Sequence, residues 1–366
     1  MTATATLVFL AVVGARFLVP LLIFKYPLPA ILAALVLDAV DQTVFQSFGF
    51  DPPGYQGYDK AMDVYYLAIA YLSTLRNWSS LPAVRVARFL YFYRLIGVVA
   101  FELLDSRALL LIFPNTFEYF FIAYEVVRLF WNPARVSMRS WVWTAGIIWV
   151  FVKLPQEWWI HIAQRDFTET VAEVPWFGPV VVAGLVGLVL VWWFVIRPRQ
   201  PARDWSWHVA ADPLPTSALT VAARDRWVAE HGKLWSTGTL EKVVLVGLLW
   251  VIYAQVLPGV QTTSGRLFLG TTAFVLVNCA VALWVARAGH GVQPILGAFG
   301  ARVLLNAGLV LVAYWLLARG RGDLEWNDAL FFVLLLSLLT LLDDRYRPIY
   351  ELRFFPAAPK EQPVAA

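Results

Sequence analysis

Long apolar runs without charge dominate the chain and recur along most of its length. They show neither the strict alternation of a half-buried strand nor the broad polar face of a soluble amphipathic helix. Runs of about 18 residues or more are long enough to cross a hydrocarbon core of about 30 Å. Because backbone groups in lipid must be hydrogen-bonded within the protein, these runs predict membrane-spanning helices.

The pattern predicts an all-α, polytopic integral membrane protein with about eleven transmembrane helices. The second run, 26–41, is short and is compatible with an incomplete or re-entrant segment. Prolines inside or at the edge of runs predict kinks or broken turns at Pro20, Pro114, Pro155 and Pro179. The expected spans are 5–24, 26–41, 61–75, 89–104, 108–127, 141–162, 177–196, 243–258, 267–286, 303–318 and 327–342.

Lysine and arginine are shared unequally between the two sides that these spans define. When the loops are assigned alternately to two sides, twenty of the 29 basic residues fall on one side, six on the other and three inside spans. Membrane proteins retain basic residues on the cytoplasmic side. The count therefore predicts an N-terminus outside and a C-terminus in the cytoplasm.

One long polar stretch, 197–242, separates two membrane parts. Within it, the segment SALTVAARDRWVAEHGKLW is typical of an amphipathic helix that lies on the anionic inner leaflet of a membrane. We therefore expect a seven-helix part over 1–196, a cytoplasmic basic linker, a four-helix part over 243–343 and a partly disordered cytoplasmic tail over 344–366.

Composition supports a membrane protein and excludes several other classes. The chain is 60% hydrophobic and only 15% charged, whereas soluble domains average about 45–50% and about 25%. The single cysteine, Cys279, excludes a disulfide framework and a thiolate metal cluster. The first run lacks a basic leader and a cleavage site, so we expect it to be a retained helix. The expected partner is the lipid bilayer of the cell membrane, and no feature indicates nucleic-acid binding.

Ionisable side chains concentrate in the first six spans. The middles of spans eight to eleven contain only Asn278 and Asn306 as strongly polar groups. Ionisable residues within a bilayer are costly and usually face the protein interior or a water-filled cavity. We therefore expect any chemistry in the first part of the chain. The ionisable residues there are Arg16, Asp38, Asp63, Arg94, Glu102, Glu118, Lys153, Glu157 and His161.

Two pairs of aspartates form the main candidate site. Asp38 and Asp41 are three residues apart at the end of the second span, and Asp59 and Asp63 are four apart at the start of the third. Each spacing places a pair on one helical face, and the two pairs are expected to meet on the outer side. Oxygen ligands of this kind suit a divalent cation such as Mg²⁺ or Mn²⁺. The alternative is that the aspartates only mark helix ends at the water interface.

A stripe of three ionisable residues runs outward from the middle of the sixth span. Lys153, Glu157 and His161 follow one another at successive i, i+4 positions. The functional interpretation is a proton relay or substrate clamp, in which Glu157 and His161 are the catalytic residues. The structural interpretation is an internal ion pair between Lys153 and Glu157, each offsetting the burial cost of the other.

A third polar position lies near the middle of the fifth span. Glu118 is expected there, with Glu125 two turns further on the same face. Pro114, just before it, would free a backbone carbonyl and open a polar gap. Arg94 in the preceding span is expected at a matching depth as a counter-charge. Arg94, Glu118 and Lys153 thus form a predicted intramembrane charge network, whose alternative role is a structural salt bridge.

The spacing D-x2-D-x17-D-x3-D of the four aspartates is similar to the acidic pattern of the CDP-alcohol phosphotransferases. The resemblance implies a divalent metal on the aspartates and activation of an alcohol against a nucleotide-linked donor. The sequence departs from the family pattern at Gln42 and Tyr55, where the family has glycines, and at Phe45-Gln46, where it has alanine and arginine. The predicted outer location also departs from it, because CDP-linked donors are cytoplasmic.

An outward acidic site between early helices also resembles the architecture of polyprenyl-phosphate-dependent membrane glycosyltransferases. In those enzymes, carboxylates of the first outer loop bind metal or act as a base. One hypothesis is therefore transfer chemistry on a lipid-linked substrate, with an aspartate, or Glu157 with His161, as general base. A second is a proton- or ion-coupled transporter that uses the intramembrane charges. A third is a non-catalytic membrane scaffold.

Overall fold

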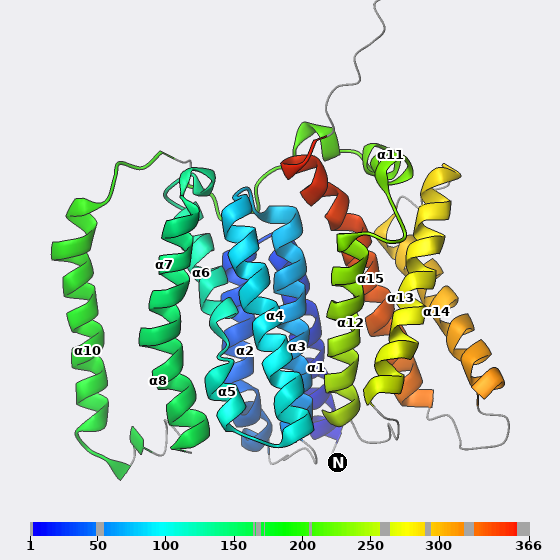
Figure 1. Ribbon diagram of the computed structural model, residues 1–366. Helices are drawn as coiled ribbons and strands as arrows, with labels where there is room; N and C mark the ends of the chain where they lie inside the picture. Colours follow the sequence, from blue (N-terminus) through cyan, green and yellow to red (C-terminus); the bar gives the residue numbers. More distant parts are fainter. Residues whose placement is uncertain are drawn as a thin grey trace, which may run out of the picture.

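The computed structural model consists of helices over the part of the chain that it describes, and most of them stand roughly parallel to one another (Figure 1). The described residues are 3–48, 55–163, 165, 170–171, 173–204, 207–256, 264–289, 294–317 and 326–356. This architecture follows from local sequence, because long uncharged segments satisfy their own backbone hydrogen bonds by forming helices.

The first four long helices form the centre of the bundle. They are α1 (Ala3–Leu21), α2 (Pro27–Ser47), α3 (Tyr55–Asn77) and α4 (Leu81–Leu104). Helix α2 is a full helix of 21 residues, so the second span is neither incomplete nor re-entrant. The hydropathy falls after Asp41, but the helix continues because the buried Phe45 packs on Phe9, with ring centroids 5.8 Å apart.

The fifth span is broken, and the break lies at Pro114, where the sequence predicts one. Helix α5 (Ala108–Ile112) ends before it and helix α6 (Thr116–Arg128) begins two residues after it. The proline cannot donate to the helical ladder. Gly97 of α4 lets the break approach closely, because a Cβ atom at that position would lie 2.1 Å from the Cβ of Phe113.

The sixth span is one helical rod of mixed geometry. It comprises α7 (Met138–Ile147), a π-helical stretch (Ile148–Lys153), α8 (Leu154–Glu157) and a second π-helical stretch (Trp158–Ile162). Widened π turns within helices are frequent at functional sites. Helix α10 (Phe177–Val191) follows at the edge of the molecule, and none of its side chains is buried (Figure 1).

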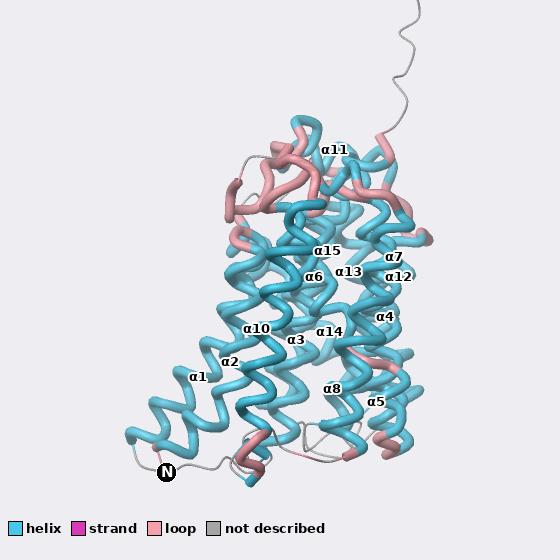
Figure 2. The backbone as a smooth tube through the Cα atoms, turned by 90° about the vertical axis from the view of Figure 1, so that its left-hand side faces the viewer, coloured by secondary structure: helices cyan, strands magenta, loops and turns pink. Residues whose placement is uncertain are grey.

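The remaining helices are α11 (Val221–His231), α12 (Thr237–Val256), α13 (Ser264–Arg287), α14 (Ile295–Leu317) and α15 (Trp326–Phe354). Helix α11 lies at one end of the bundle, which we call the α11 end; the N-terminus lies at the opposite end (Figures 1 and 2).

Buried amides join three helices of the second part. Asn278 of α13 donates to the side chain of Asn306 in α14 at 2.6 Å, and Asn306 donates to Ser337 of α15 at 2.9 Å. Side-chain amides that bond across helices are a usual means of holding transmembrane helices together. The two asparagines that stand out in the sequence therefore have a packing role.

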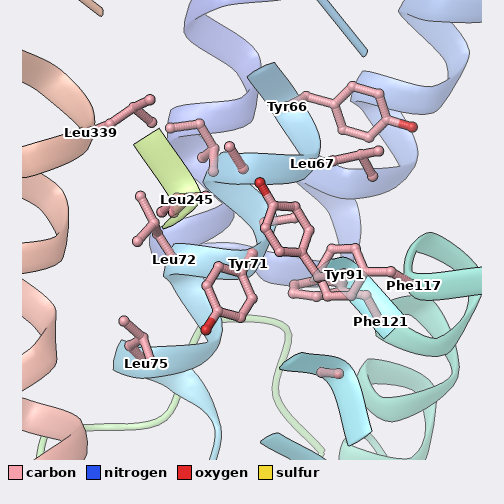
Figure 3. Packing of buried hydrophobic residues seen from close by; sticks show 14 of the residues in the cluster. Tyr66, Leu67, Tyr71, Leu72, Leu75, Tyr91, Phe117, Phe121, Leu245 and Leu339 are labelled. Atoms are coloured by element: carbon pink, nitrogen blue, oxygen red, sulfur yellow. The ribbon is translucent and has the colours of Figure 1, made fainter. Parts of the chain in front are cut away.

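An aromatic and aliphatic core lies around α3, against which α12 and α15 both pack. Figure 3 shows its centre, where the rings of Tyr71 and Tyr91 stack with centroids 4.5 Å apart. Phe117 of α6 meets Tyr91 edge to face at 5.3 Å. Such pairs each add about 0.5–1.5 kcal/mol beyond the burial of their area. The core thus fixes α3, α4 and α6 relative to one another.

Seven helices among the described residues are long and apolar enough to cross a membrane. They start at Thr6, Pro27, Ala108, Phe177, Thr237, Gly265 and Ile295. Helices α3, α4 and α15 are as long, with 23, 24 and 29 residues, but carry more charge. The chain is therefore a multi-pass membrane protein whose more polar helices lie among apolar ones.

Candidate functional site

The guanidinium of Arg16 lies among all four aspartates. Its Nη1 atom donates to Asp41 and, at 2.9 Å, to Asp59. Its Nη2 atom donates to Asp38 and, at 3.1 Å, to Asp63. The two predicted pairs therefore do meet, and the residue that joins them comes from α1. Arg16 is recognisable in the sequence as an intramembrane charge, but the spacing of the aspartates does not identify it as their partner.

Arg16, Asp38 and Asp63 lie well within their helices. Asp38 is about 14 Å of helix before the end of α2, and Asp63 is about 12 Å after the start of α3. Arg16 is about 20 Å from the start of α1. Asp59, about 6 Å after the start of α3, is the member nearest to a helix end, as the alternative interpretation of the aspartates expects.

Charge is not balanced inside the cluster. When all four carboxylates are ionised, one guanidinium leaves a formal excess of three negative charges. The side chains of Arg16 and Asp41 are buried, whereas those of Asp38, Asp59 and Asp63 are 26%, 34% and 40% exposed. Ionised groups away from water need partners. The exposed three therefore present an electronegative surface that attracts protons or metal cations.

Three of the aspartates are arranged as potential ligands. Asp38, Asp59 and Asp63 each offer a carboxylate oxygen, and these oxygens lie within 4.8 Å of one another. A hard divalent cation binds such oxygens at about 2.0–2.6 Å, so three ligands around one ion fit this separation. Asp41 is outside this group of three and serves Arg16. The cluster could thus hold one cation beside the guanidinium.

Aromatic side chains enclose the cluster along the helix axes. Towards the end of the bundle that carries the N-terminus, the ring of Tyr58 lies 5.5 Å from the Arg16 guanidinium carbon and 6.4 Å from the ring of Phe45. On the side of the α11 end, the ring of Tyr65 lies 4.9 Å from that of Phe17 at an interplanar angle of 51°, and its hydroxyl donates to the Phe17 carbonyl oxygen at 3.0 Å. Aromatic side chains thus lie on both sides of the cluster along the helices.

A second group of polar contacts surrounds the break between α5 and α6. The backbone N–H of Asn115 donates to Glu157 Oε1 at 3.1 Å, and its side chain donates to Glu118 Oε2 at 2.8 Å. Arg94 donates to the carbonyl oxygen of Phe113 at 3.0 Å. The groups left unpaired by the break are thus served by α4 and α8, and the N-terminus of α6 is held by a carboxylate, which its dipole favours.

The stripe on the sixth span is joined to this break. Glu157 Oε2 lies 3.0 Å from His161 Nε2. Lys153 donates to Gln156 at 3.0 Å, and its ammonium lies 4.2 Å from the ring centroid of Tyr119. Among the described residues, Lys153 forms no ion pair with Glu157, nor Arg94 with Glu118. Arg94 binds the Phe113 carbonyl oxygen at the break, and Lys153 binds Gln156, so each cation has a neutral hydrogen-bond acceptor.

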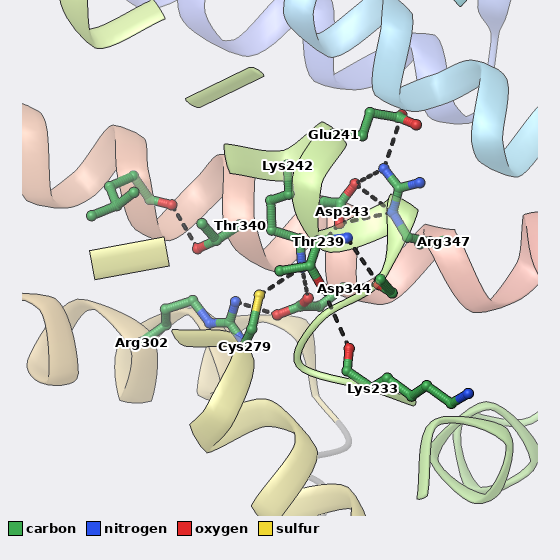
Figure 4. Close-up of polar contacts among 12 residues, drawn as sticks. Lys233, Thr239, Glu241, Lys242, Cys279, Arg302, Thr340, Asp343, Asp344 and Arg347 are labelled. Atoms are coloured by element: carbon green, nitrogen blue, oxygen red, sulfur yellow. Dashed lines mark hydrogen bonds and ion pairs between the residues drawn. The ribbon is translucent and has the colours of Figure 1, made fainter. Parts of the chain in front are cut away.

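A larger buried charge network, which the sequence analysis does not foresee, lies near the α11 end (Figure 4). Arg347 donates to Asp343 at 2.6 Å and to Glu241 at 3.0 Å. Lys242 lies 3.0 Å from Asp343 and also binds Asp344. The adjacent charges in "EK" at 241–242 and "DDRYR" at 343–347 are the signal that could have identified it. Since its acids and bases are paired, we assign it to the attachment of α12 to α15.

The polar linker is also attached by an internal ion pair. Arg128 at the end of α6 binds Glu125 at 2.7 Å and the linker residue Asp212 at 3.0 Å. Glu125 also accepts a hydrogen bond from Trp78 at 2.9 Å. These contacts hold the linker on the bundle and give Glu125 a structural partner.

No family model, curated protein or solved structure matches this chain. Its function therefore has to be argued from its own residues.

Proposed function

We propose that this protein is a membrane-embedded enzyme that catalyses a cation-dependent transfer on a lipid-linked substrate. The observation that carries the proposal is the meeting of Asp38, Asp59 and Asp63, whose oxygens lie within 4.8 Å of one another. A Mg²⁺ or Mn²⁺ ion on these ligands would neutralise the charge of a phosphate and polarise it for transfer.

The depth of the cluster favours a substrate that is itself in the membrane. The three ligands lie about 6–14 Å inside their helices, and their side chains are partly exposed on the flank of the bundle. A phosphate borne by a lipid can approach such a position laterally. A water-soluble nucleotide-linked donor would have to leave water to reach it, which argues against the chemistry of the CDP-alcohol phosphotransferases.

The chain offers two sources of a general base. Arg16 holds the carboxylates in place, and Asp41, which is buried against it, keeps the guanidinium oriented. An aspartate of the cluster could then accept a proton from an attacking hydroxyl. The pair of Glu157 and His161 is the alternative, because a carboxylate 3.0 Å from an imidazole orients that ring for proton transfer. Arg94, Glu118 and Lys153 then set the charge around this pair.

The packing between the cluster and the α11 end favours an enzyme over a transporter. From Ala68 to Leu72, every residue of α3 is fully buried. Figure 3 shows Tyr71 and Leu72 packed with residues of neighbouring helices in this region. A transporter needs a polar route through the bundle. The close packing of this part of α3 supports an enzyme instead, with a site that opens to one side only.

The topology that agrees with this proposal has eleven spans. Helices α3, α4 and α15 and the rod 138–162 would join the seven apolar spans. The α11 end, with most basic residues, would face the cytoplasm of the cell membrane, and the cluster would lie nearer the outer face. Cysteine labelling on a Cys279→Ser background tests this: Phe48→Cys should react only from outside and Trp235→Cys only from inside.

A proton- or ion-coupled transporter is the second candidate, and the broken fifth span favours it. Discontinuous helices commonly form the binding sites of transporters. Glu118 is buried beside the break, and its Oε1 atom has no hydrogen-bond partner among the described residues. In this alternative, Glu118 would take up and release a cation together with Lys153 and Glu157.

Comparing lipid extracts tests the proposed reaction. Membranes that contain the wild-type protein or the folded Asp59→Asn variant are incubated with Mn²⁺ or with a chelator, and phosphate-containing lipids are profiled by mass spectrometry. We expect a lipid that is consumed only by the wild type with Mn²⁺. Identical profiles, together with a cation flux in proteoliposomes, would establish the transporter instead. Identical lipid profiles without any cation flux would contradict both activities and would support a non-catalytic membrane scaffold.

A further inference from the structure

A cavity of about 240 Å³ lies under α11, between that helix and the adjoining parts of α13, α14 and α15. It is separate from the aspartate cluster, which belongs to α1, α2 and α3. Its lining combines two kinds of surface. Three arginines come from three different helices, Arg224 from α11, Arg302 from α14 and Arg345 from α15, and most of the rest is alanine, valine and leucine.

The cationic groups of this cavity exceed its available carboxylates. Asp344 binds Lys242 and lies 2.5 Å from Arg302, so its charge is already shared by two cations. Within the described part of the chain, Arg224 donates only to backbone oxygens, those of Thr220 at 3.3 Å and Arg345 at 3.5 Å. Among the described residues, neither Arg224 nor Arg345 forms an ion pair with a carboxylate. Two guanidinium groups are thus left for an external anion.

The electrostatics around Arg224 favour a bound anion. Burial lowers the pKa of Arg224, and the nearby charge of Arg345 lowers it further. Asp225 is the remaining acid of the lining; burial raises its pKa, and the charges of Arg224 and Arg345 lower it, so one carboxylate faces two guanidinium groups. Two like charges held together in a partly buried place repel each other, and an anion bound between them would relieve that repulsion.

The apolar lining explains what kind of anion fits. Ala286 of α13 and Ala301 of α14 are small side chains on the walls, and Leu341 of α15 lies beneath them. The outer faces of the same helices carry bare apolar side chains, with Leu304 75% and Trp284 69% exposed. This lining borders surface of the kind that faces lipid, so an acyl chain can lie against it while a phosphate meets the arginines.

We propose that this cavity binds one anionic phospholipid, with the phosphate held by Arg224 and Arg345 under α11 and an acyl chain between α13 and α14. Guanidinium groups are suited to phosphate because they offer several donors in one plane. The lipid would hold α11, which lies at the predicted cytoplasmic interface, against α13, α14 and α15. This site is independent of the proposed transfer reaction.

Native mass spectrometry of the full-length protein in detergent micelles tests the site. Dioleoyl phosphatidylglycerol, dioleoyl phosphatidylcholine and inorganic phosphate are added separately, and thermal unfolding is followed in parallel. The variants are Arg345→Gln, which removes one phosphate donor, and Ala301→Phe, which narrows the wall without changing charge. Arg226→Gln is the matched control, because this arginine of α11 is exposed and does not line the cavity.

We expect phosphatidylglycerol to bind and to raise the unfolding temperature of the wild type and of Arg226→Gln. Arg345→Gln should bind it at least about tenfold more weakly, as the loss of one hydrogen bond to a charged group implies, and Ala301→Phe should also weaken it. Equal binding to Arg345→Gln and Arg226→Gln would overturn the proposal. So would equal binding of phosphatidylcholine, or protection by inorganic phosphate alone, which would make the site one for a free anion.

Discussion

Arg16 Nη1 lies 2.9 Å from Asp59 Oδ1, and this contact joins α1 to α3 inside the bundle. The same guanidinium reaches both aspartates of α2. The acidic cluster is therefore organised around a cation supplied by the protein, and α1 is required to assemble it. The cluster holds its shape through Arg16 and retains an excess of negative charge for an external cation.

Replacement of Arg16 by glutamine should destabilise the fold strongly. Removal of one partner from a buried ionic group costs about 3–5 kcal/mol, and here four carboxylates would be left facing one another. The free energy of unfolding in detergent micelles measures the effect. Arg94→Gln is the matched intramembrane control, because Arg94 contacts a backbone carbonyl, and its loss should be smaller.

A double variant separates charge from packing at the same position. Arg16→Gln combined with Asp41→Asn removes one of the opposing charges and should recover part of the lost stability. Equal stability of Arg16→Gln and the wild type would contradict the central role of this arginine. Additive losses in the double variant would show that Arg16 acts through packing alone.

Glu157 should be needed as a hydrogen-bond acceptor as well as a charge. Its Oε1 atom accepts the backbone N–H of Asn115 at the start of α6. Glu157→Leu leaves that donor unpaired in the bundle and should cost about 1–3 kcal/mol more than Glu157→Gln, which keeps an acceptor. Thermal unfolding of the two variants in the same detergent makes the comparison. Identical unfolding temperatures would show that the bond does not support the broken helix.

Gly97 should be intolerant of even a methyl group. An added Cβ atom would lie 2.1 Å from Phe113 Cβ, so Gly97→Ala must displace the break between α5 and α6. Overpacking of this kind costs about 1–3 kcal/mol. Gly14→Ala is the control, because no atom lies within 4 Å of its added Cβ; it should be neutral or slightly stabilising. If both substitutions have the same effect on unfolding, the close approach is not required.

Asp343 should be the most sensitive acid of the network near the α11 end. Its side chain is fully buried between Arg347 and Lys242. Asp343→Asn leaves two cations short of a counter-charge, and the expected loss of unfolding free energy is about 3–5 kcal/mol. Glu230→Gln, an exposed acid on α11, should change stability little. A small effect of Asp343→Asn would mean that Glu241 and Asp344 compensate for it.

The helical class and the approximate spans follow from hydropathy because a lipid environment demands long uncharged helices. Helix ends follow less well. Helix α2 extends past Asp41 because Phe45 is buried, and α15 extends to Phe354 because its charges find partners on other helices. Hydropathy averages over a window and cannot register a single buried ring or a long-range ion pair.

The candidate site was predictable only in part, for a related reason. Spacing along one helix places Asp38 beside Asp41, and Asp59 beside Asp63. The partner of all four is Arg16, which is 22 residues from the nearest of them in sequence, and only packing of α1 against α2 and α3 brings it there. Likewise, the binding of Arg94 to the Phe113 carbonyl depends on the geometry of the helix break.

Equilibrium binding of Mn²⁺ to the purified protein, followed by electron paramagnetic resonance, tests the central claim most directly. We expect about one ion per chain, displaced by excess Mg²⁺, in keeping with three carboxylate ligands around one site. Asp59→Asn, shown to be folded by circular dichroism, should weaken binding at least about tenfold. Asp105→Asn is the control: Asp105 ends α4 outside the cluster, with a φ of 48°, which asparagine also tolerates. Absence of Mn²⁺ binding to the wild type at millimolar concentration, or unchanged binding to folded Asp59→Asn, would contradict a cation site on these aspartates.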